Sequence, residues 1–288
     1  MKNFCNICPR NCNVDRTKNI GFCGVDNNIY INKIMIHHFE EPCVSGNDKI
    51  KGSGAIFFAS CNLKCVYCQN YKISRTVNGT KFSPRELADV MRELETEGAY
   101  NINFVTPTHY TKQIIEALKI YKPNIPIIWN TSGYEKAETI EMLNGLVDVF
   151  LTDFKYYSPE ISMKYSLAKD YYNYASESLK KMREIVPTDE FEDGMIKKGI
   201  IVRHLLLPNN VKDSIEVLKS IKKLIGLPIL SIMSQYTPMQ KYDYNELNNY
   251  IKPIEYKIVL LKAQELGFDR IYIQDFSSAD SKYTPDFD

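Results

Sequence analysis

From residue 55 onward, short runs of apolar and β-branched residues alternate with longer stretches in which apolar residues recur every three or four positions. A short apolar run bounded by turn residues predicts a buried strand, and the longer spacing predicts an amphipathic helix that packs on it. The predicted strands lie at residues 55–59, 102–105, 126–129, 147–151, 199–207, 228–233 and 270–274.

Helices are predicted between these strands. Ser83 and Glu86 form a capping box with a proline at the first helical position, and Gly98 ends that helix. Asp213 and Glu216 predict the start of a later helix in the same way. The apolar residues that define the helices are Leu87, Val90, Met91 and Leu94, then Ile114, Ile115 and Leu118, then Ile140 and Leu143, then Tyr171, Tyr172, Ala175, Leu179 and Met182, then Leu218, Ile221 and Leu224, with a last helix near 254–266.

Strands that alternate with helices form right-handed βαβ units and a parallel sheet, which predicts an α/β protein. We expect a partial (β/α) barrel of the TIM type over residues 51–288, preceded by a small cysteine-rich arm over residues 1–50. Residues 29–31 and 34–36 predict short extended pieces in the arm. Residues 187–198 are acidic and polar, and they predict a mobile loop that interrupts the alternation.

The composition argues against several kinds of partner. The 288 residues carry a net charge of +1 with scattered lysines and arginines, so we expect no nucleic-acid binding. No stretch approaches the roughly 20 apolar residues of a membrane span, and the first residues lack the apolar region of a signal peptide. Eight cysteines without an export signal indicate a reducing cytoplasm and metal ligation.

Three of the cysteines, Cys61, Cys65 and Cys68, follow the first predicted barrel strand at the spacing C-x3-C-x2-C. Thiolates are the ligands of iron–sulfur clusters. Three of them can hold three irons of a 4Fe–4S cube and leave the fourth iron open to chelate the amino and carboxylate groups of S-adenosylmethionine (SAM). Zinc and disulfides are the alternatives, but a structural zinc site usually has four ligands, often as two C-x2-C pairs.

Polar residues also follow the other predicted strands, where a βα barrel builds its active site. The motifs in chain order are Thr106-Pro107-Thr108-His109, Asn130-Thr131-Ser132-Gly133-Tyr134, Asp153-Phe154-Lys155, Arg203-His204 and Ser234-Gln235-Tyr236. Polar or metal-binding residues thus follow six predicted strands in succession, counting the cysteines, which predicts a functional site rather than ordinary loops.

In combination these motifs resemble those of the radical-SAM superfamily, and from Cys5 to Phe287 the chain is similar to proteins related to pyruvate formate-lyase activating enzyme. The resemblance implies a partial (β/α) barrel and a 4Fe–4S cluster held by the three cysteines. It also implies reductive cleavage of SAM, which releases a 5′-deoxyadenosyl radical.

The resemblance implies roles for residues on the first three strands. Tyr67 takes the aromatic position near the adenine, and Asn130 and Thr131 stand where the activating enzyme has Asp-Thr, near SAM and a monovalent cation. The superfamily's Gly-Gly-Glu motif, which binds the methionyl amine, appears here as Thr106-Pro-Thr108. Backbone carbonyls or threonine hydroxyls would therefore have to replace the carboxylate.

The next two strands are matched as well. Asp153 and Lys155 stand on the Asp-x-Lys motif near the methionyl carboxylate, and Arg203 stands on an arginine beside SAM. Lysine and arginine can hold a carboxylate, arginine in bidentate fashion. Because residues two apart on a strand face the same side, an internal ion pair between Asp153 and Lys155 is the structural alternative.

Four further cysteines, Cys5, Cys8, Cys12 and Cys23, lie within nineteen residues among glycines and a proline. They predict a second metal centre, either zinc or an iron–sulfur cluster, and the spacing does not choose between the two. Free reduced cysteines in a loose arm are the alternative. The arm has too few apolar residues to fold unaided, so a metal would supply the missing free energy.

A polar cluster precedes the first barrel strand and contains His37, His38, Glu40, Glu41 and Cys43. The two histidines read as half-buried hydrogen-bond donors or, less commonly, as ligands. Cys43 has three alternative interpretations: an inert small residue, a spare ligand or a reactive thiol.

We therefore expect a radical-SAM enzyme that abstracts a hydrogen atom from a protein, peptide or small-molecule substrate, with activation of a glycyl-radical enzyme as one candidate activity. Its electron donor would be a flavodoxin or a ferredoxin. The competing hypothesis is an iron–sulfur or zinc protein that senses redox state or scaffolds a partner without cleaving SAM.

Overall fold

The computed structural model describes residues 4–273 and 287. Its strands are β1 (Ile29–His37), β2 (Ser53–Phe58), β3 (Thr80–Phe82), β4 (Asn101–Val105), β5 (Ile127–Thr131), β6 (Val149–Asp153), β7 (Glu190–Glu192), β8 (Met195–Leu205), β9 (Ile229–Met233) and β10 (Ile271–Ile273). Its α-helices are α1 (Pro42–Ser45), α2 (Tyr71–Ser74), α3 (Pro84–Thr96), α4 (Thr111–Ile120), α5 (Ala137–Glu141), α6 (Pro159–Ser166), α7 (Tyr171–Ile185), α8 (Val211–Ile225) and α9 (Pro253–Glu265). Two 3₁₀ turns span Thr108–Tyr110 and Asn245–Asn248.

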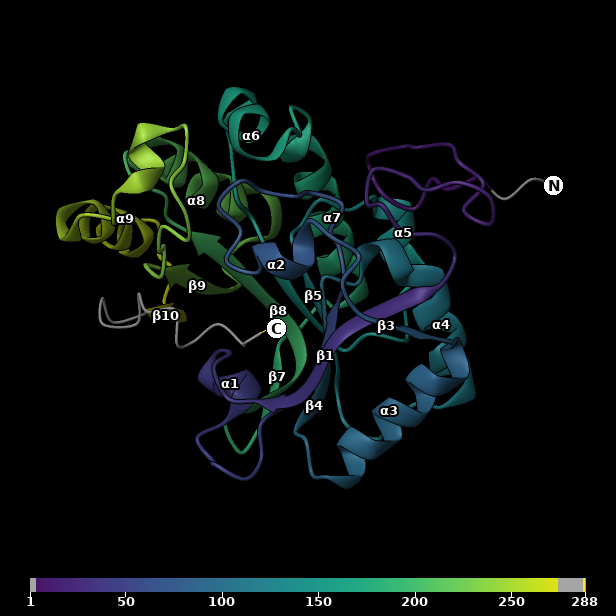
Figure 1. Ribbon diagram of the computed structural model, residues 1–288. Helices are drawn as coiled ribbons and strands as arrows, with labels where there is room; N and C mark the ends of the chain where they lie inside the picture. Colours follow the sequence, from purple (N-terminus) through teal and green to yellow (C-terminus); the bar gives the residue numbers. More distant parts are fainter. Residues whose placement is uncertain (1–3, 274–286, 288) are drawn as a thin grey trace.

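The strands form one sheet in the order β10-β9-β8-β6-β5-β4-β2-β1-β3, and β7 pairs with β8 beside this path. From β2 to β10 along that order, every neighbouring pair is parallel. Helices α3 to α9 connect these strands and stand around them (Figure 1). The predicted α/β class and partial (β/α) barrel are confirmed.

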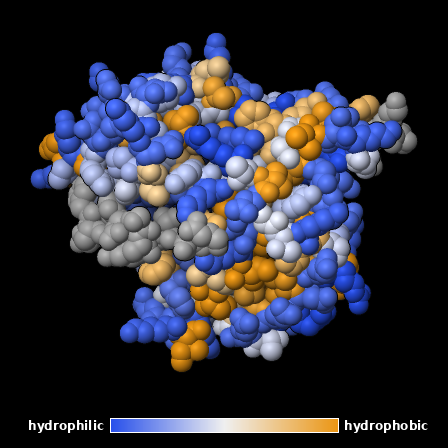
Figure 2. Space-filling view, in the orientation of Figure 1, coloured by the Kyte–Doolittle hydropathy of each residue, from blue (hydrophilic) through white to orange (hydrophobic). Residues whose placement is uncertain are grey.

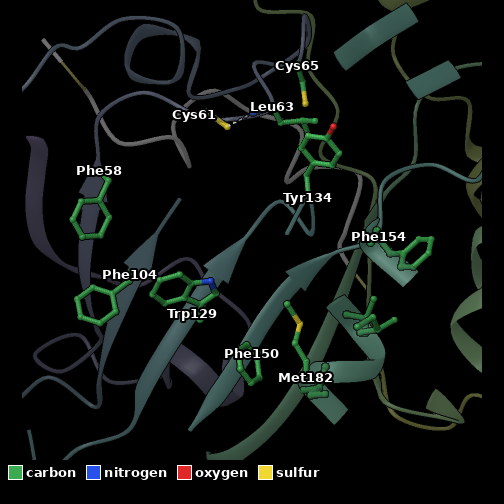
Figure 3. Close-up of a cluster of buried hydrophobic side chains, with 14 of the residues drawn as sticks. Phe58, Cys61, Leu63, Cys65, Phe104, Trp129, Tyr134, Phe150, Phe154 and Met182 are labelled. Carbon is green, nitrogen blue, oxygen red and sulfur yellow. Dashed lines mark hydrogen bonds between the residues drawn. The ribbon is translucent and has the colours of Figure 1, made fainter. Parts of the chain in front are cut away.

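Residues alternate between the two faces of the sheet along each strand. Both faces are buried, and different side chains pack on each. Phe104, Trp129 and Phe150 from β4, β5 and β6 are fully buried on the face covered by the helices (Figure 3). Ile128 points to the opposite face and packs with Cys43 of α1 in a second apolar cluster. The helix α1 therefore fills part of the inner face of the sheet, and Cys43 is a buried packing residue there.

The N-terminal segment extends the sheet at one edge. Residues predicted as two extended pieces form the single strand β1, which pairs antiparallel with β2 and with β3. Apolar side chains gather on the surface where β1 meets α3 (Figure 2). Ile34 of β1 is 37% exposed. The division of the chain at residue 50 stays a prediction.

The prediction of a loop at 187–198 is wrong, because β7 and the start of β8 form an antiparallel hairpin there. Asp193 and Gly194 join the two strands with φ values of 51° and 80°. Asp-Gly is a preferred pair for such hairpin turns, in which both central residues need positive φ. This turn signal lies inside an acidic stretch, where composition hides it.

The two predicted helix caps had different outcomes. The capping box of Ser83 and Glu86 is present in both directions at the start of α3. Asp213 lies inside α8 rather than at its cap, and its carboxylate accepts hydrogen bonds from the backbone N–H groups of Tyr157 and Ser158 at 3.1 and 2.7 Å. The predicted cap is thus a tether for the loop after β6. Gln274, the end of the last predicted strand, lies outside the described residues.

Gly133 is the glycine on which the loop after β5 depends. Its φ is +76°, and a Cβ at this position would lie 2.2 Å from the backbone oxygen of Asp153. Gly98 has a φ of +89° but nothing within 4 Å of the same position. We expect Gly133→Ala to lower the free energy of unfolding by roughly 3 kcal/mol, because overpacking adds to backbone strain. Gly98→Ala carries the strain alone and should cost about 1 kcal/mol.

Urea denaturation of both variants beside the wild type measures the difference. Equal losses for the two variants would show that the contact between Gly133 and Asp153 does not matter.

Candidate active site

The three cysteines after β2 line one cavity of about 470 Å³ at the carboxyl ends of the parallel strands. Figure 3 places Cys61 and Cys65 beyond the strands that carry Phe104 and Trp129. The loop turns sharply between them, with Lys64 at a φ of 54°. The backbone therefore returns all three thiols to the same cavity although they span eight residues of sequence.

Contacts from distant parts of the chain fix the cysteine loop. The guanidinium of Arg10 donates to the backbone oxygens of Asn62 at 2.8 Å and of Ser166 at 2.9 Å. The hydroxyl of Ser166 donates to the Cys65 sulfur at 3.0 Å and is hydrogen-bonded to the Tyr156 hydroxyl at 2.7 Å. Tyr156 in turn is hydrogen-bonded to the Tyr67 hydroxyl at 2.6 Å. Tyr67 is thus held within the site that it lines.

Cys61 and Cys65 are buried and Cys68 is half-buried, and burial favours the protonated form of a thiol. Burial, together with the neighbouring Cys65, raises the pKa of Cys61 to about 12. Burial also raises the pKa of Cys68. Iron ligation would therefore release protons from these groups.

Among residues 4–273 and 287, no three His, Cys, Asp or Glu side chains lie close enough together to hold a single metal ion. A cube of four irons is larger than one ion, so its thiolates stand farther apart than those of a single zinc. Three thiols that line one cavity, two of them buried and that of Cys68 half-buried, match the donor set that such a cluster needs.

The other residues predicted to contact SAM line the same cavity as the cysteines. They are Tyr67, Thr106, Asn130, Thr131, Asp153, Lys155 and Arg203. The strand order explains why they converge, because parallel strands end at one edge of the sheet. Their roles in binding SAM stay predictions.

Asp153 and Lys155 form the ion pair expected as the structural alternative. Burial opposes the charged amine, but the Asp153 carboxylate and the nearby Cys65 raise the pKa of Lys155 above its usual value. Both side chains remain partly accessible, at 14% for Lys155 and 21% for Asp153. The pair therefore coexists with exposure to the cavity.

Arg203 has partners that were not foreseen from the sequence. Its Nε donates to Glu41 at 2.8 Å, and its guanidinium also pairs with Glu40. Glu40 further accepts hydrogen bonds from the side-chain amides of Asn103 at 2.9 Å and Asn130 at 3.4 Å. Burial would raise the pKa of Glu40, but Arg203 and the other donors lower it below its usual value.

A second buried carboxyl, Glu135, was also missed. One of its oxygens accepts hydrogen bonds from Thr131 at 2.6 Å, Thr108 at 2.8 Å and the Trp129 indole at 3.1 Å. Burial raises the pKa of Glu135. The only sequence signal was its place directly after the Asn-Thr-Ser-Gly-Tyr motif, and that motif gives no hint that the hydroxyl of Thr131 would turn toward it.

Two histidines of the strand-end motifs are structural. His109 is hydrogen-bonded to the backbone oxygen of Ala59, and burial lowers its pKa to about 3. His204 is hydrogen-bonded to the backbone oxygen of Phe154, and burial lowers its pKa to about 4. Both are therefore neutral imidazoles near pH 7.

The N-terminal cysteines form a group beside the cysteine loop. Cys8 and Cys23 are buried, whereas Cys5 and Cys12 are partly exposed. The backbone N–H of Phe22 donates to the Cys12 sulfur at 3.2 Å. Burial raises the pKa of Cys8 to about 12, and the other three cysteines are near enough to raise it further. The hydroxyl of Ser60, next to Cys61, donates to the backbone oxygen of Cys23.

Comparison with known proteins finds a family match and similarities to individual proteins. The model of the Radical SAM superfamily matches residues 55–221. The uncharacterized protein MJ0674 of Methanocaldococcus jannaschii is 29% identical over 279 residues, which cover 93% of this chain and 76% of that protein.

Two solved structures resemble the fold at low identity. Streptococcus suis SuiB has a TM-score of 0.47 at 14% identity, over 76% of this chain and 49% of SuiB. QueE from Escherichia coli has a TM-score of 0.45 at 9% identity, over 86% of this chain and 94% of QueE.

None of the helices in the described part of the chain has the length and apolar character that crossing a membrane requires.

We expect Arg203→Met to lower the free energy of unfolding by roughly 3–5 kcal/mol near neutral pH, because Glu40 and Glu41 would stay buried without their cation. Arg203 lowers the pKa of Glu40 in the folded protein. The stability that this ion pair contributes is therefore fully present above the pKa of an unfolded glutamate, and it is lost as the pH falls through the lower pKa of the folded protein. The difference between variant and wild type should therefore shrink from about pH 7.5 to about pH 3, which lies below the usual pKa of a glutamate.

Urea denaturation at both pH values tests this expectation. Arg92→Met is the matched control, because Arg92 pairs with Asp89 at the surface, where each side chain is 51% exposed. That variant should lose less than about 1 kcal/mol at either pH. A loss for Arg203→Met that does not depend on pH would contradict the role assigned to the carboxylates.

Proposed function

Because the chain belongs to the radical SAM superfamily, whose model covers residues 55–221, we propose that it cleaves SAM reductively and uses the resulting radical to take a hydrogen atom from a protein, peptide or small-molecule substrate. The observation that carries this proposal is the shared cavity. Three thiols, two of them buried, and the polar ends of β4, β5, β6 and β8 line one space of about 470 Å³. This volume lies within the range of ordinary ligand pockets.

The residues of this chain divide the work of binding. Cys61, Cys65 and Cys68 would hold three irons of the 4Fe–4S cluster and leave one iron for SAM. The pair of Asp153 and Lys155 faces the cavity, and its ammonium would meet the methionyl carboxylate. When bound and given one electron, the cluster and SAM supply a 5′-deoxyadenosyl radical, which becomes 5′-deoxyadenosine on taking a substrate hydrogen.

The rest of the site orients these groups. Tyr67 lines the cavity and is fixed through Tyr156 and Ser166, a chain that ends on the Cys65 sulfur. Asn130 and Thr131 border the same space, and we place SAM and a monovalent cation beside them. The electron would come from a small carrier of the flavodoxin or ferredoxin type in the cytoplasm. A glycyl-radical enzyme is one protein substrate that would suit this chemistry.

We expect Cys61→Ala, Cys65→Ala and Cys68→Ala each to abolish SAM cleavage, because the cluster needs all three thiolates. The measurement is 5′-deoxyadenosine formed after anaerobic reconstitution and reduction with dithionite. Cys43→Ala is the matched control, since Cys43 packs in the apolar cluster with Val44 and Ile128. It should keep both its iron and its activity.

Retained cleavage in any of the three variants, at the iron content of the wild type, would refute the ligand assignment. Absence of 5′-deoxyadenosine from wild-type protein that carries a full cluster would refute the proposed function and favour a redox-sensing or scaffold protein.

We also propose a second metal centre at Cys5, Cys8, Cys12 and Cys23. In support, the four thiols lie near one another, two of them are buried, and a backbone N–H already donates to Cys12. The side chains do not stand at single-ion distances, so binding would draw them together. The ligand set is complete with four thiolates, which makes the centre structural or electron-carrying.

Replacing all four arm cysteines by alanine should remove this centre and leave the cluster at Cys61, Cys65 and Cys68. Iron, sulfide and zinc per chain are the measurements. A loss of about four irons identifies a second cluster, and a loss of one zinc identifies a zinc site. Metal content equal to that of the wild type would show that no second centre exists.

A further inference from the structure

The inner wall of the cavity contains two carboxylates that share one arginine. Glu40 and Glu41 both pair with Arg203, and the exposed fractions of these side chains are 8%, 5% and 13%. All three residues line the cavity. We call Glu40, Glu41 and Arg203 the acidic wall.

The acidic wall carries more negative than positive charge. The other donors to Glu40 are the neutral amides of Asn103 and Asn130. The second ion pair on the cavity, Asp153 with Lys155, is balanced within itself. Among the described carboxylates, lysines and arginines that line the cavity, the acidic groups therefore exceed the basic groups by one.

A purely structural tether does not need this excess. One carboxylate binds one guanidinium through two parallel hydrogen bonds and leaves no net charge. A second buried carboxylate costs desolvation free energy that the single arginine must offset for both. The arrangement is most stable when another cation completes it.

A residue that lines the same cavity carries a ring nitrogen without a partner in the described part of the chain. His37 is 6% exposed, and its Nδ1 is buried without a hydrogen-bond partner in the described part of the chain. The imidazole packs edge-on against Phe57 with ring centroids 5.8 Å apart. Burial lowers the pKa of His37, so the ring is neutral and its Nδ1 can accept a hydrogen bond.

We propose that the acidic wall and His37 bind a cationic nitrogen of the substrate, either an ammonium or a guanidinium group. This rests on the proposed function, because it names the chemical class that the cavity would present to the radical. The positive group would balance the second carboxylate and donate hydrogen bonds to Glu40 and His37. The carbon that loses its hydrogen would lie on the side of the group that faces the cysteines.

The test uses three probes with the same five-carbon chain and different charge: pentylamine, 1-pentanol and pentanoate. Each is titrated against the full-length, anaerobically reconstituted protein with saturating SAM, and binding is read from the ligand by saturation-transfer NMR. We expect the amine to bind at least about tenfold more tightly than the alcohol, and pentanoate to bind more weakly than either.

Matched variants locate the binding. Glu40→Gln and Glu41→Gln keep the shape of the side chain and should each weaken the amine at least about fivefold without changing the alcohol. Glu192→Gln is the control, because Glu192 is 70% exposed and pairs with Lys197 at the surface. It should leave all three probes unchanged. Thermal melts identify any variant that fails to fold.

Equal binding of amine and alcohol to the wild type would overturn the proposal without any variant. SAM also carries an ammonium group, so SAM affinity is measured by equilibrium dialysis in the wild type and in Glu40→Gln. Unchanged SAM affinity supports the proposal. If Glu40→Gln no longer binds SAM, and SAM added to the wild type displaces pentylamine, the acidic wall binds SAM itself and the proposal fails. The formation of 5′-deoxyadenosine by the wild type is scored separately, so a failure of the proposed function is recognised independently.

Discussion

Parallel strands that lie side by side must all end at the same edge, and this constraint assembles the site. The pairing of β2, β4, β5, β6 and β8 brings the cysteine loop, Thr106, Asn130, Asp153 and Arg203 to one cavity although they span about half of the sequence. The helices on the outer face and α1 on the inner face then bury the strands between them. The strand ends are left as the place where polar groups meet the cavity.

The regular part of the fold could be predicted from sequence because its cause is local. Apolar periodicity is present in each strand and helix separately, and the capping box of Ser83 and Glu86 lies within four residues. The misses share a different origin. The Asp193–Gly194 turn was hidden by its acidic neighbours. The carboxylate of Asp213 does not cap its own helix but accepts hydrogen bonds from residues more than fifty positions away.

The site was predictable to the same extent. The cysteines and the residues after each strand could be chosen because they stand at positions that the alternation itself defines. The partners of Arg203 could not, because Glu40 is 163 residues away in sequence and reaches it from outside the βα repeat. Glu135 escaped for a similar reason, since only folding turns three donors toward one buried oxygen.

The guanidinium of Arg10 has a consequence for how the protein is made. Its acceptors lie 52 and 156 residues later in the chain, on Asn62 and Ser166. During synthesis from the N-terminus, the first cysteines leave the ribosome early, but Arg10 cannot complete its contacts until more than half of the chain has emerged. The N-terminal cysteines are therefore open to metal donors and oxidants throughout this interval, and Arg10 is held in place only when α6, which ends at Ser166, has formed.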